Sequence, residues 1–214
     1  SMKLLNHFGV KKPLISYHEH NHVTAGQSVL NRLLAGESCA LMTDAGTPAI
    51  SDPGEDLVRL CAENGVEVRA IPGCCAAVNA LAVSGLPTGR FTFEGFLTVN
   101  RKSRREHLDS LKEETRTMIF HEAPHKLRTT LDDLTAAFGP ERRISLCREM
   151  TKLHEEVIRC TLAEAAAYYQ ENTPKGEYVL VVAGAAPKTG AAVTLEDGVA
   201  QVLALKEQGM RLKD

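Results

Sequence analysis

Four features are missing from this 214-residue chain, and each absence excludes a class of protein. No apolar run approaches the ~20 residues that a membrane span needs, and no signal peptide precedes the first expected element. None of the six cysteines forms a CxxC pair, which is typical of reduced thiols in a cytoplasmic protein. The net charge is only -2, so any contact with nucleic acid must come from a local basic patch.

What is present is an alternation of short apolar runs with amphipathic stretches. This alternation predicts an α/β fold with mostly parallel strands and helices on the faces of the sheets. Strands are expected over 13–19, 38–44, 66–72, 115–122, 142–149, 155–161 and 177–184. Helices are expected over 27–37, 55–64, 74–85, 124–139 and 162–172.

The alternation of strands and helices is interrupted once, over residues 91–114, and this interruption divides the chain into two domains. We predict an N-terminal α/β domain over 1–90 and a C-terminal α/β domain over 115–187. Residues 91–114, which contain a basic cluster, are predicted to be a linker, and 188–214 a tail helix that begins a further extension.

The stretch from Asp44 to Leu57 is longer and richer in turn residues than a strand-to-helix connection requires. A Gly-rich turn before a helix suggests phosphate, but neither GxGxxG nor GxxxxGK[ST] is present. Asp44 and Asp52 flank the turn with no Lys or Arg between them, which favours a neutral or cationic ligand. A second Gly turn over 71–77 would lie at the same sheet edge, where α/β proteins bind ligands. The alternative is that both turns are plain connections.

Eight motifs follow one another along the chain, namely DAGTP (44–48), SDPG (51–54), PGCCAA (72–77), SGLP (84–87), FEGFL (93–97), FHEAPHKL (120–127), CREMTK (147–152) and KGEYVLVVAG (175–184). Together they resemble the tetrapyrrole methylase superfamily of S-adenosylmethionine-dependent methyltransferases, and within it the branch that modifies ribosomal RNA. The resemblance implies two α/β domains of the tetrapyrrole methylase type with the ligand cleft between them, a homodimer, and no metal. The implied reaction is 2'-O-methylation of a cytidine in the decoding region of small-subunit (16S) rRNA, free or in the 30S subunit.

The resemblance also implies a set of residues that hold the methyl donor. They lie in the two Gly turns and after two strands of the second domain. They are Asp44, Gly46, Thr47, Pro48, Ile50, Cys75, Ala76, Glu122, Arg148 and Met150. The donor is a sulfonium cation, which agrees with the carboxylates of the first turn.

Two segments of that superfamily branch are not found in this sequence. One is an N-terminal strand with the pattern P.GN..D.T, and the other is an AEDTR segment before KLLNHFG (3–9). The branch also continues beyond the position where this sequence stops. We therefore expect a fragment that lacks the first strand of its sheet.

Methyl transfer to a ribose hydroxyl depends on alignment and is helped by a base. The candidates near the expected cleft are Glu122, Glu149 and Lys152, with His125 as a further one. The alternative is that the two glutamates form structural ion pairs with Arg148 or Lys126.

RNA binding needs positive charge, and one segment supplies it. Residues 100–107 bring together Arg101, Lys102, Arg104 and Arg105, which we interpret as a phosphate-contact patch. The alternative is an ordinary solvated helix start. A separate group, His18, His20 and His22, could hold zinc if the segment were extended, although a polar loop at the cleft rim is the simpler interpretation.

Two other functions stay open at this point. The first keeps the fold but changes the substrate to a tetrapyrrole, such as a precorrin or uroporphyrinogen. The second is a non-catalytic RNA-binding or ribosome-assembly module.

Overall fold

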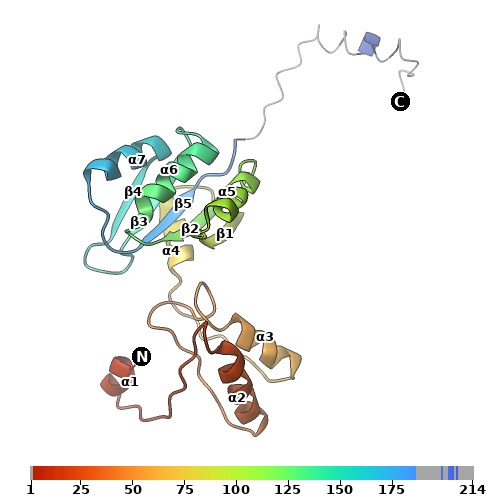
Figure 1. Ribbon diagram of the computed structural model, residues 1–214, viewed down its shortest axis with the longest axis vertical. Coiled ribbons are helices and arrows are strands. Elements are labelled where there is room, and N and C mark those ends of the chain that lie inside the picture. The colour runs from red at the N-terminus through yellow and green to blue at the C-terminus, as the bar shows by residue number, and fades with distance from the viewer. Residues whose placement is uncertain (1, 187–198, 200–201, 205, 207–214) are drawn as a thin grey trace.

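The computed structural model describes residues 2–186, 199, 202–204 and 206, so the expected tail over 188–214 lies almost wholly outside the described residues. The chain forms two lobes that are joined by a narrow connection just before helix α4 (Figure 1). Among the helices described, none is long and apolar enough to cross a membrane.

The C-terminal lobe is built on a five-stranded sheet with the order β1-β2-β5-β3-β4. Its strands are β1 (Phe91–Phe96), β2 (Thr117–Glu122), β3 (Arg143–Arg148), β4 (Glu156–Thr161) and β5 (Tyr178–Val182). Only β1 and β2 pair in parallel, while the β2–β5, β5–β3 and β3–β4 pairs are antiparallel. The expectation of mostly parallel pairing is therefore wrong, because β5 inserts between β2 and β3 and runs against both.

Helices cover both faces of this sheet. Helices α5 (Arg101–Ser110), α6 (Leu127–Phe138) and α7 (Leu162–Glu171) pack on one face, and α4 (Ala76–Ser84) packs on the other. The central strand β5 is buried on both sides, with Leu180 facing the three helices and Val181 facing α4. This explains why its sequence is a continuous apolar run rather than an alternating one.

Two segments belong to the C-terminal lobe, although the sequence analysis expected them to lie outside the second domain. Residues 91–114, expected as a linker, form the edge strand β1 and helix α5. Helix α4, expected in the first domain, packs on the sheet of the second through Ala77, Ala80 and Leu81. Its small side chains allow this close approach, and Ala80 is fully buried. The boundary between the lobes therefore falls near residue 75.

The N-terminal lobe contains α1 (Met2–His7), α2 (His22–Leu34) and α3 (Glu55–Glu63). Helices α2 and α3 pack around Val29, Leu57 and Cys61. The strands expected over 13–19, 38–44 and 66–72 do not form, and these segments have no regular secondary structure over most of their length. An apolar run becomes a strand only where a neighbouring strand pairs with its backbone, and these runs have no such ladder.

Candidate functional site

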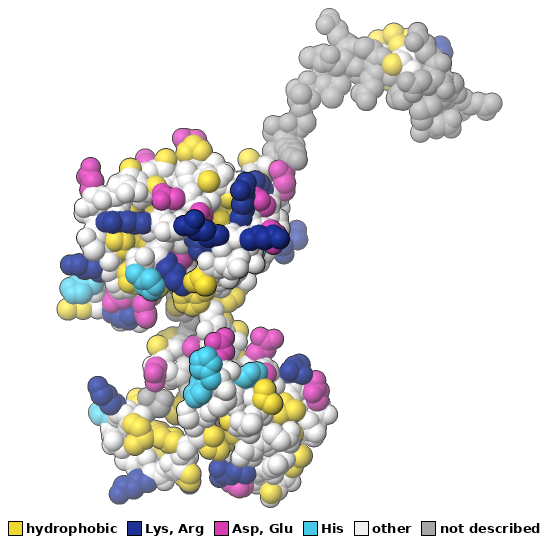
Figure 2. Space-filling model, viewed as in Figure 1, with side chains coloured by type: hydrophobic (Ala, Val, Ile, Leu, Met, Phe, Trp, Pro, Cys, Tyr) yellow, Lys and Arg dark blue, Asp and Glu magenta, His cyan; other side chains and the backbone are white. Residues whose placement is uncertain are grey.

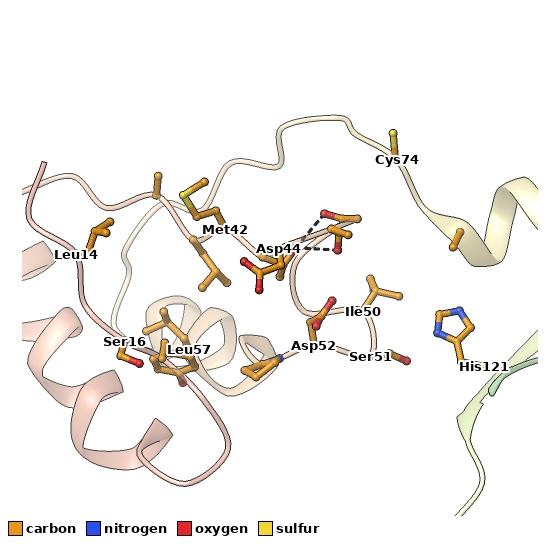
Figure 3. A pocket seen from close by; sticks show the side chains of 18 of the residues that line it. Leu14, Ser16, Met42, Asp44, Ile50, Ser51, Asp52, Leu57, Cys74 and His121 are labelled. Atoms are coloured by element: carbon orange, nitrogen blue, oxygen red, sulfur yellow. Dashed lines mark hydrogen bonds between the residues drawn. The ribbon is translucent and has the colours of Figure 1, made fainter. Parts of the chain in front are cut away.

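A cleft of about 1700 Å³ lies between the two lobes. Strands β1, β2 and β3 run in the same direction, so their carboxyl ends meet at the sheet edge that borders it. The loop 44–53 and the turn at Cys74 border the cleft from the other side (Figure 3). In the space-filling view, the cleft lies at the constriction between the two lobes (Figure 2). Ligands bind at this position in α/β proteins.

The two Gly turns are tied to each other. The Thr47 hydroxyl donates a hydrogen bond of 2.9 Å to the carbonyl oxygen of Cys74. Within the first turn, the Thr43 hydroxyl lies 3.0 Å from the carbonyl oxygen of Ala45 and 3.2 Å from that of Gly46 (Figure 3). Gly46 has a φ of 80°, which a side chain would disfavour. The turns therefore form one joined wall of the cleft.

Backbone strain is concentrated at the cleft. Among the described residues, positive φ angles outside glycine occur at Ala49 (66°), Ser51 (59°), Glu149 (51°) and Thr151 (66°). These positions fall in two loops that both border the cleft, one after the first Gly turn and one after β3. Each such conformation costs about 1 kcal/mol or more and is typical of loops that are held in place for a ligand.

Glu122, at the end of β2, is held by a buried chain of hydrogen bonds. Its Oε1 accepts a 2.8 Å bond from the Ala123 amide, and its Oε2 accepts one from the Thr130 hydroxyl. Thr130 in turn accepts a 2.8 Å bond from Arg104, whose Nε donates to Asp133 at 2.5 Å. Glu122 is only 3% exposed. The chain therefore fixes the direction of this carboxylate at the cleft wall.

The basic cluster on α5 is divided between the surface and the interior. Arg104 is 8% exposed and shares the inward face of the helix with Leu108, so the expectation that it contacts RNA is wrong. Its guanidinium is already bonded inside the lobe. Arg101, Lys102 and Arg105 remain exposed. Lys and Arg side chains are also visible on the α5 side of this lobe (Figure 2).

Glu149 and Lys152 meet in an ion-paired cluster. Lys152 Nζ lies 2.9 Å from Glu149 Oε1 and 2.9 Å from Glu177 Oε2. Hydrogen bonds to Glu177 and Glu149 raise the pKa of Lys152, and the ammonium lowers the pKa of Glu149. A lysine held in its charged form is a poor proton acceptor, which disfavours Lys152 as the base. Arg148 instead pairs with Glu156 at 3.1 Å.

The residues expected to hold the donor fall into two groups. One group lines the cleft, and the other lies within two residues of lining residues in the sequence. The first group is Asp44, Gly46, Ile50, Ala76, Glu122 and Met150. The second is Thr47, Pro48, Cys75 and Arg148.

One cleft residue, His121, was missed by the sequence interpretation. It lies on β2 directly before Glu122, and its ring meets Phe93 and Phe96 edge-on, with centroids 5.3 and 5.4 Å away. The ring faces Ile50 and Ser51 of the first loop (Figure 3). The only signal in the sequence is a polar residue at the end of an apolar strand.

The three histidines of the first lobe do not converge. His22 Nδ1 lies 2.5 Å from Asp56 Oδ2, whereas His18 and His20 contact each other with ring centroids 6.0 Å apart. No group of three His, Cys, Asp or Glu side chains in the described part of the chain is arranged for a metal ion. The structure therefore gives the zinc alternative no support.

The architecture and the cleft can now be compared with known proteins. Residues 4–166 match the family described as Tetrapyrrole (Corrin/Porphyrin) Methylases, and the chain belongs to this family. The resemblance and the α/β fold class expected from the sequence are thereby confirmed. A solved structure of the methyltransferase CobJ has a TM-score of 0.59 at 21% identity, covering 81% of this chain and 74% of that one.

Curated relatives narrow the comparison within the family. The chain is 52% identical to ribosomal RNA small subunit methyltransferase I of Synechocystis sp., over 87% of this chain and 67% of that protein. It is 50% identical to the protein of the same name from Halalkalibacterium halodurans, over 85% of this chain and 63% of that protein. The chain thus spans about two thirds of the length of these relatives.

Proposed function

We propose that this chain is the core of an S-adenosylmethionine-dependent methyltransferase that methylates the 2'-hydroxyl of a cytidine in small-subunit (16S) rRNA. The observation that carries the proposal is the cleft between the lobes, walled by two joined Gly turns, in a chain 52% identical to a ribosomal RNA methyltransferase. Methyl transfer needs little more than two reactants held in line, which such a cleft provides.

The chemistry of the cleft fits the methyl donor. Asp44 and Asp52 line it from the first loop (Figure 3), and carboxylates attract a sulfonium cation. Ile50, Ala76 and Met150 supply apolar walls of the kind that bury a nucleoside. When bound, S-adenosylmethionine would supply an activated methyl group, and these residues would hold and orient it.

The exposed face of α5 supports an RNA substrate. Arg101, Lys102 and Arg105 lie on one short helix that begins at the Asn100 cap, whose side chain accepts a 3.1 Å bond from the Ser103 amide. The ion pairs of Lys102 with Glu106 and of Arg105 with Asp109 are loose, at 3.9 Å each. Such pairs exchange easily for phosphate oxygens.

We also propose that the protein acts in the cytoplasm as a homodimer, on free rRNA or on the 30S subunit. Outside the residues that line the cleft, the N-terminal lobe exposes the apolar side chains of Val68 and Ile71, and exposed apolar surface is typical of an interface. Light scattering coupled to size exclusion tests this, because a single species at about twice the 23.3 kDa chain mass is expected. A monomer at all concentrations would contradict it.

The function itself is tested by transfer of a labelled methyl group. The protein is incubated with labelled S-adenosylmethionine and either 16S rRNA or 30S subunits that lack the modification. Nuclease digestion and mass spectrometry should identify 2'-O-methylcytidine. A parallel reaction contains uroporphyrinogen instead of RNA. Label in the tetrapyrrole alone would favour the competing methylase function, and RNA binding without transfer would favour a non-catalytic module.

A further inference from the structure

We propose that His121 is a catalytic residue, which accepts the proton of the ribose hydroxyl during methyl transfer. The inference rests on the proposed function and extends it, since the family comparison assigns no base to this chain.

His121 lies at the edge of the sheet that borders the cleft. It pairs in register with Phe96 of β1 and with Val179 of β5, close to the sheet edge where the cleft begins. Its ring lines the cleft, with Ile50 and Ser51 of the strained first loop in front of it (Figure 3). His121 therefore lies where the cleft walls from the two lobes are close to each other.

Nε2 of His121 is buried and has no hydrogen-bond partner among the described residues. Buried ring nitrogens are normally paired, so an exception at a ligand cleft calls for an explanation. Phe93 and Phe96, which flank the ring, offer no conventional acceptor or donor. The ring lines the cleft, so a rotation of the imidazole about χ2 would bring this nitrogen to a hydroxyl that enters there.

The charge states of the cleft residues also favour His121 as the base. Burial lowers the pKa of His121, against the smaller opposing effect of the Asp52 and Glu177 carboxylates. The imidazole is therefore neutral near pH 7 and has a lone pair available. The earlier candidates are occupied, because Lys152 is held as an ammonium, Glu149 is ion-paired, and both oxygens of Glu122 already accept hydrogen bonds.

The proposed transfer forms one bond, breaks another and moves one proton to His121. The ribose oxygen attacks the methyl carbon of the donor, and a new carbon–oxygen bond forms as the carbon–sulfur bond breaks. The electron pair of the broken bond remains on sulfur, which becomes a neutral thioether. The hydroxyl proton passes to the imidazole of His121, and the positive charge lost by sulfur reappears on the imidazolium. The carboxylates of Asp52 and Glu177 stabilise that charge before the proton leaves to solvent.

The test compares three variants in the labelled transfer reaction. His121→Phe keeps an aromatic ring beside Phe93 and Phe96, and His121→Gln keeps hydrogen-bonding capacity without a basic nitrogen. For both, kcat should fall by about 10²- to 10⁴-fold, and the acidic limb of the pH profile of kcat should disappear. The dissociation constant for S-adenosylmethionine, measured by calorimetry, should change by less than about threefold. His7→Phe, at an exposed histidine of α1 that does not line the cleft, is the matched control and should keep its kcat.

Each other outcome contradicts the proposal. A kcat within about threefold of the unchanged protein in either folded variant would show that His121 is not the base. Weakened donor binding with normal kcat at saturating donor would make it a binding residue instead. Circular dichroism shows whether each variant folds. If the unchanged protein transfers no methyl group to RNA, the proposed function itself is contradicted. If the unchanged protein and all variants transfer methyl groups equally well, only the role of His121 is contradicted.

Discussion

The hydrogen-bond chain behind Glu122 shows how one residue at the cleft depends on several that never reach it. Thr130 is completely buried and links the Glu122 carboxylate to Arg104. Removal of its hydroxyl would leave a buried carboxylate oxygen and a guanidinium N–H without partners. Such losses cost more than the mean value of a hydrogen bond.

Thr130→Val should therefore destabilise the protein by about 1–3 kcal/mol, although valine has the same shape as threonine. Urea unfolding measures this. Because Glu122 lines the cleft, the affinity for S-adenosylmethionine should also fall. Thr130→Ser restores the hydroxyl and should recover most of both properties. Equal behaviour of the valine and serine variants would mean that the hydroxyl is not what holds Glu122.

The ion-paired cluster at the end of β3 makes a prediction about pH. The ammonium of Lys152 lowers the pKa of Glu149 below its ordinary 4.5, so the pair stabilises the folded state above about pH 4.5. This stabilisation is lost as the pH falls through the lower pKa of the folded state. Glu149→Gln should thus have a lower Tm than the unchanged protein at pH 7, with the difference shrinking toward pH 3. A difference independent of pH would show that packing, not charge, is responsible.

At the scale of elements, helix α5 serves two purposes at once. Its inward face carries Arg104 and Leu108 into the lobe, and its outward face presents Arg101, Lys102 and Arg105. The helix therefore connects the proposed RNA-contact surface to the wall of the cleft, since Arg104 reaches Thr130 behind Glu122.

The double change Arg101→Glu and Arg105→Glu should weaken rRNA binding by at least tenfold. It should also reduce the salt slope of log K by about 1.4–1.8, because each lost phosphate contact removes about 0.7–0.9. Filter binding at several salt concentrations measures both. The matched control is Arg59→Glu with Arg69→Glu, which changes the charge equally on exposed residues of the other lobe. The same loss in both pairs would indicate a nonspecific effect of net charge.

At the scale of the whole molecule, the two lobes differ in how much they bury. The C-terminal lobe has two clusters of buried side chains, one on each face of its sheet. The N-terminal lobe has one small cluster between α2 and α3, and residues such as Leu14 and Ile71 stay exposed. Stability follows buried apolar surface, so it is concentrated in the C-terminal lobe.

Hydrogen exchange monitored by mass spectrometry should show this difference directly. Amides of β2 and β5 should exchange slowest, and those of 38–43 and 66–72 fastest. Saturating S-adenosylmethionine should slow exchange in the loop 44–54 and leave α7 unchanged, because only the loop borders the cleft. Uniform exchange across both lobes would contradict the unequal burial.

Much of the C-terminal lobe could be predicted from the sequence. The runs over 115–122, 142–149 and 177–184 each became a strand, because both neighbours and both faces of the sheet bury them. The run over 155–161 became the edge strand β4, which among the described strands pairs with β3 alone. Strand β1 was missed because its sequence, FTFEGF, contains Glu and Gly and lies at the sheet edge, where its residues are largely exposed or half-buried. The apolar runs of the N-terminal lobe, over 13–19, 38–44 and 66–72, do not become strands, because no neighbouring strand in the described part of the chain pairs with their backbones.

For the site, the sequence by itself determined the family and the two Gly turns, since these are local patterns of residue type and spacing. Only the tertiary structure decided that Arg104 is buried, because its partners Thr130 and Asp133 are 26 and 29 residues away. It also decided that Lys152 is an ion-pair partner and that His121 faces the cleft with an unpaired nitrogen. Local sequence sets which groups are available, whereas burial and distant partners set their charge and direction, and these depend on how the whole chain packs.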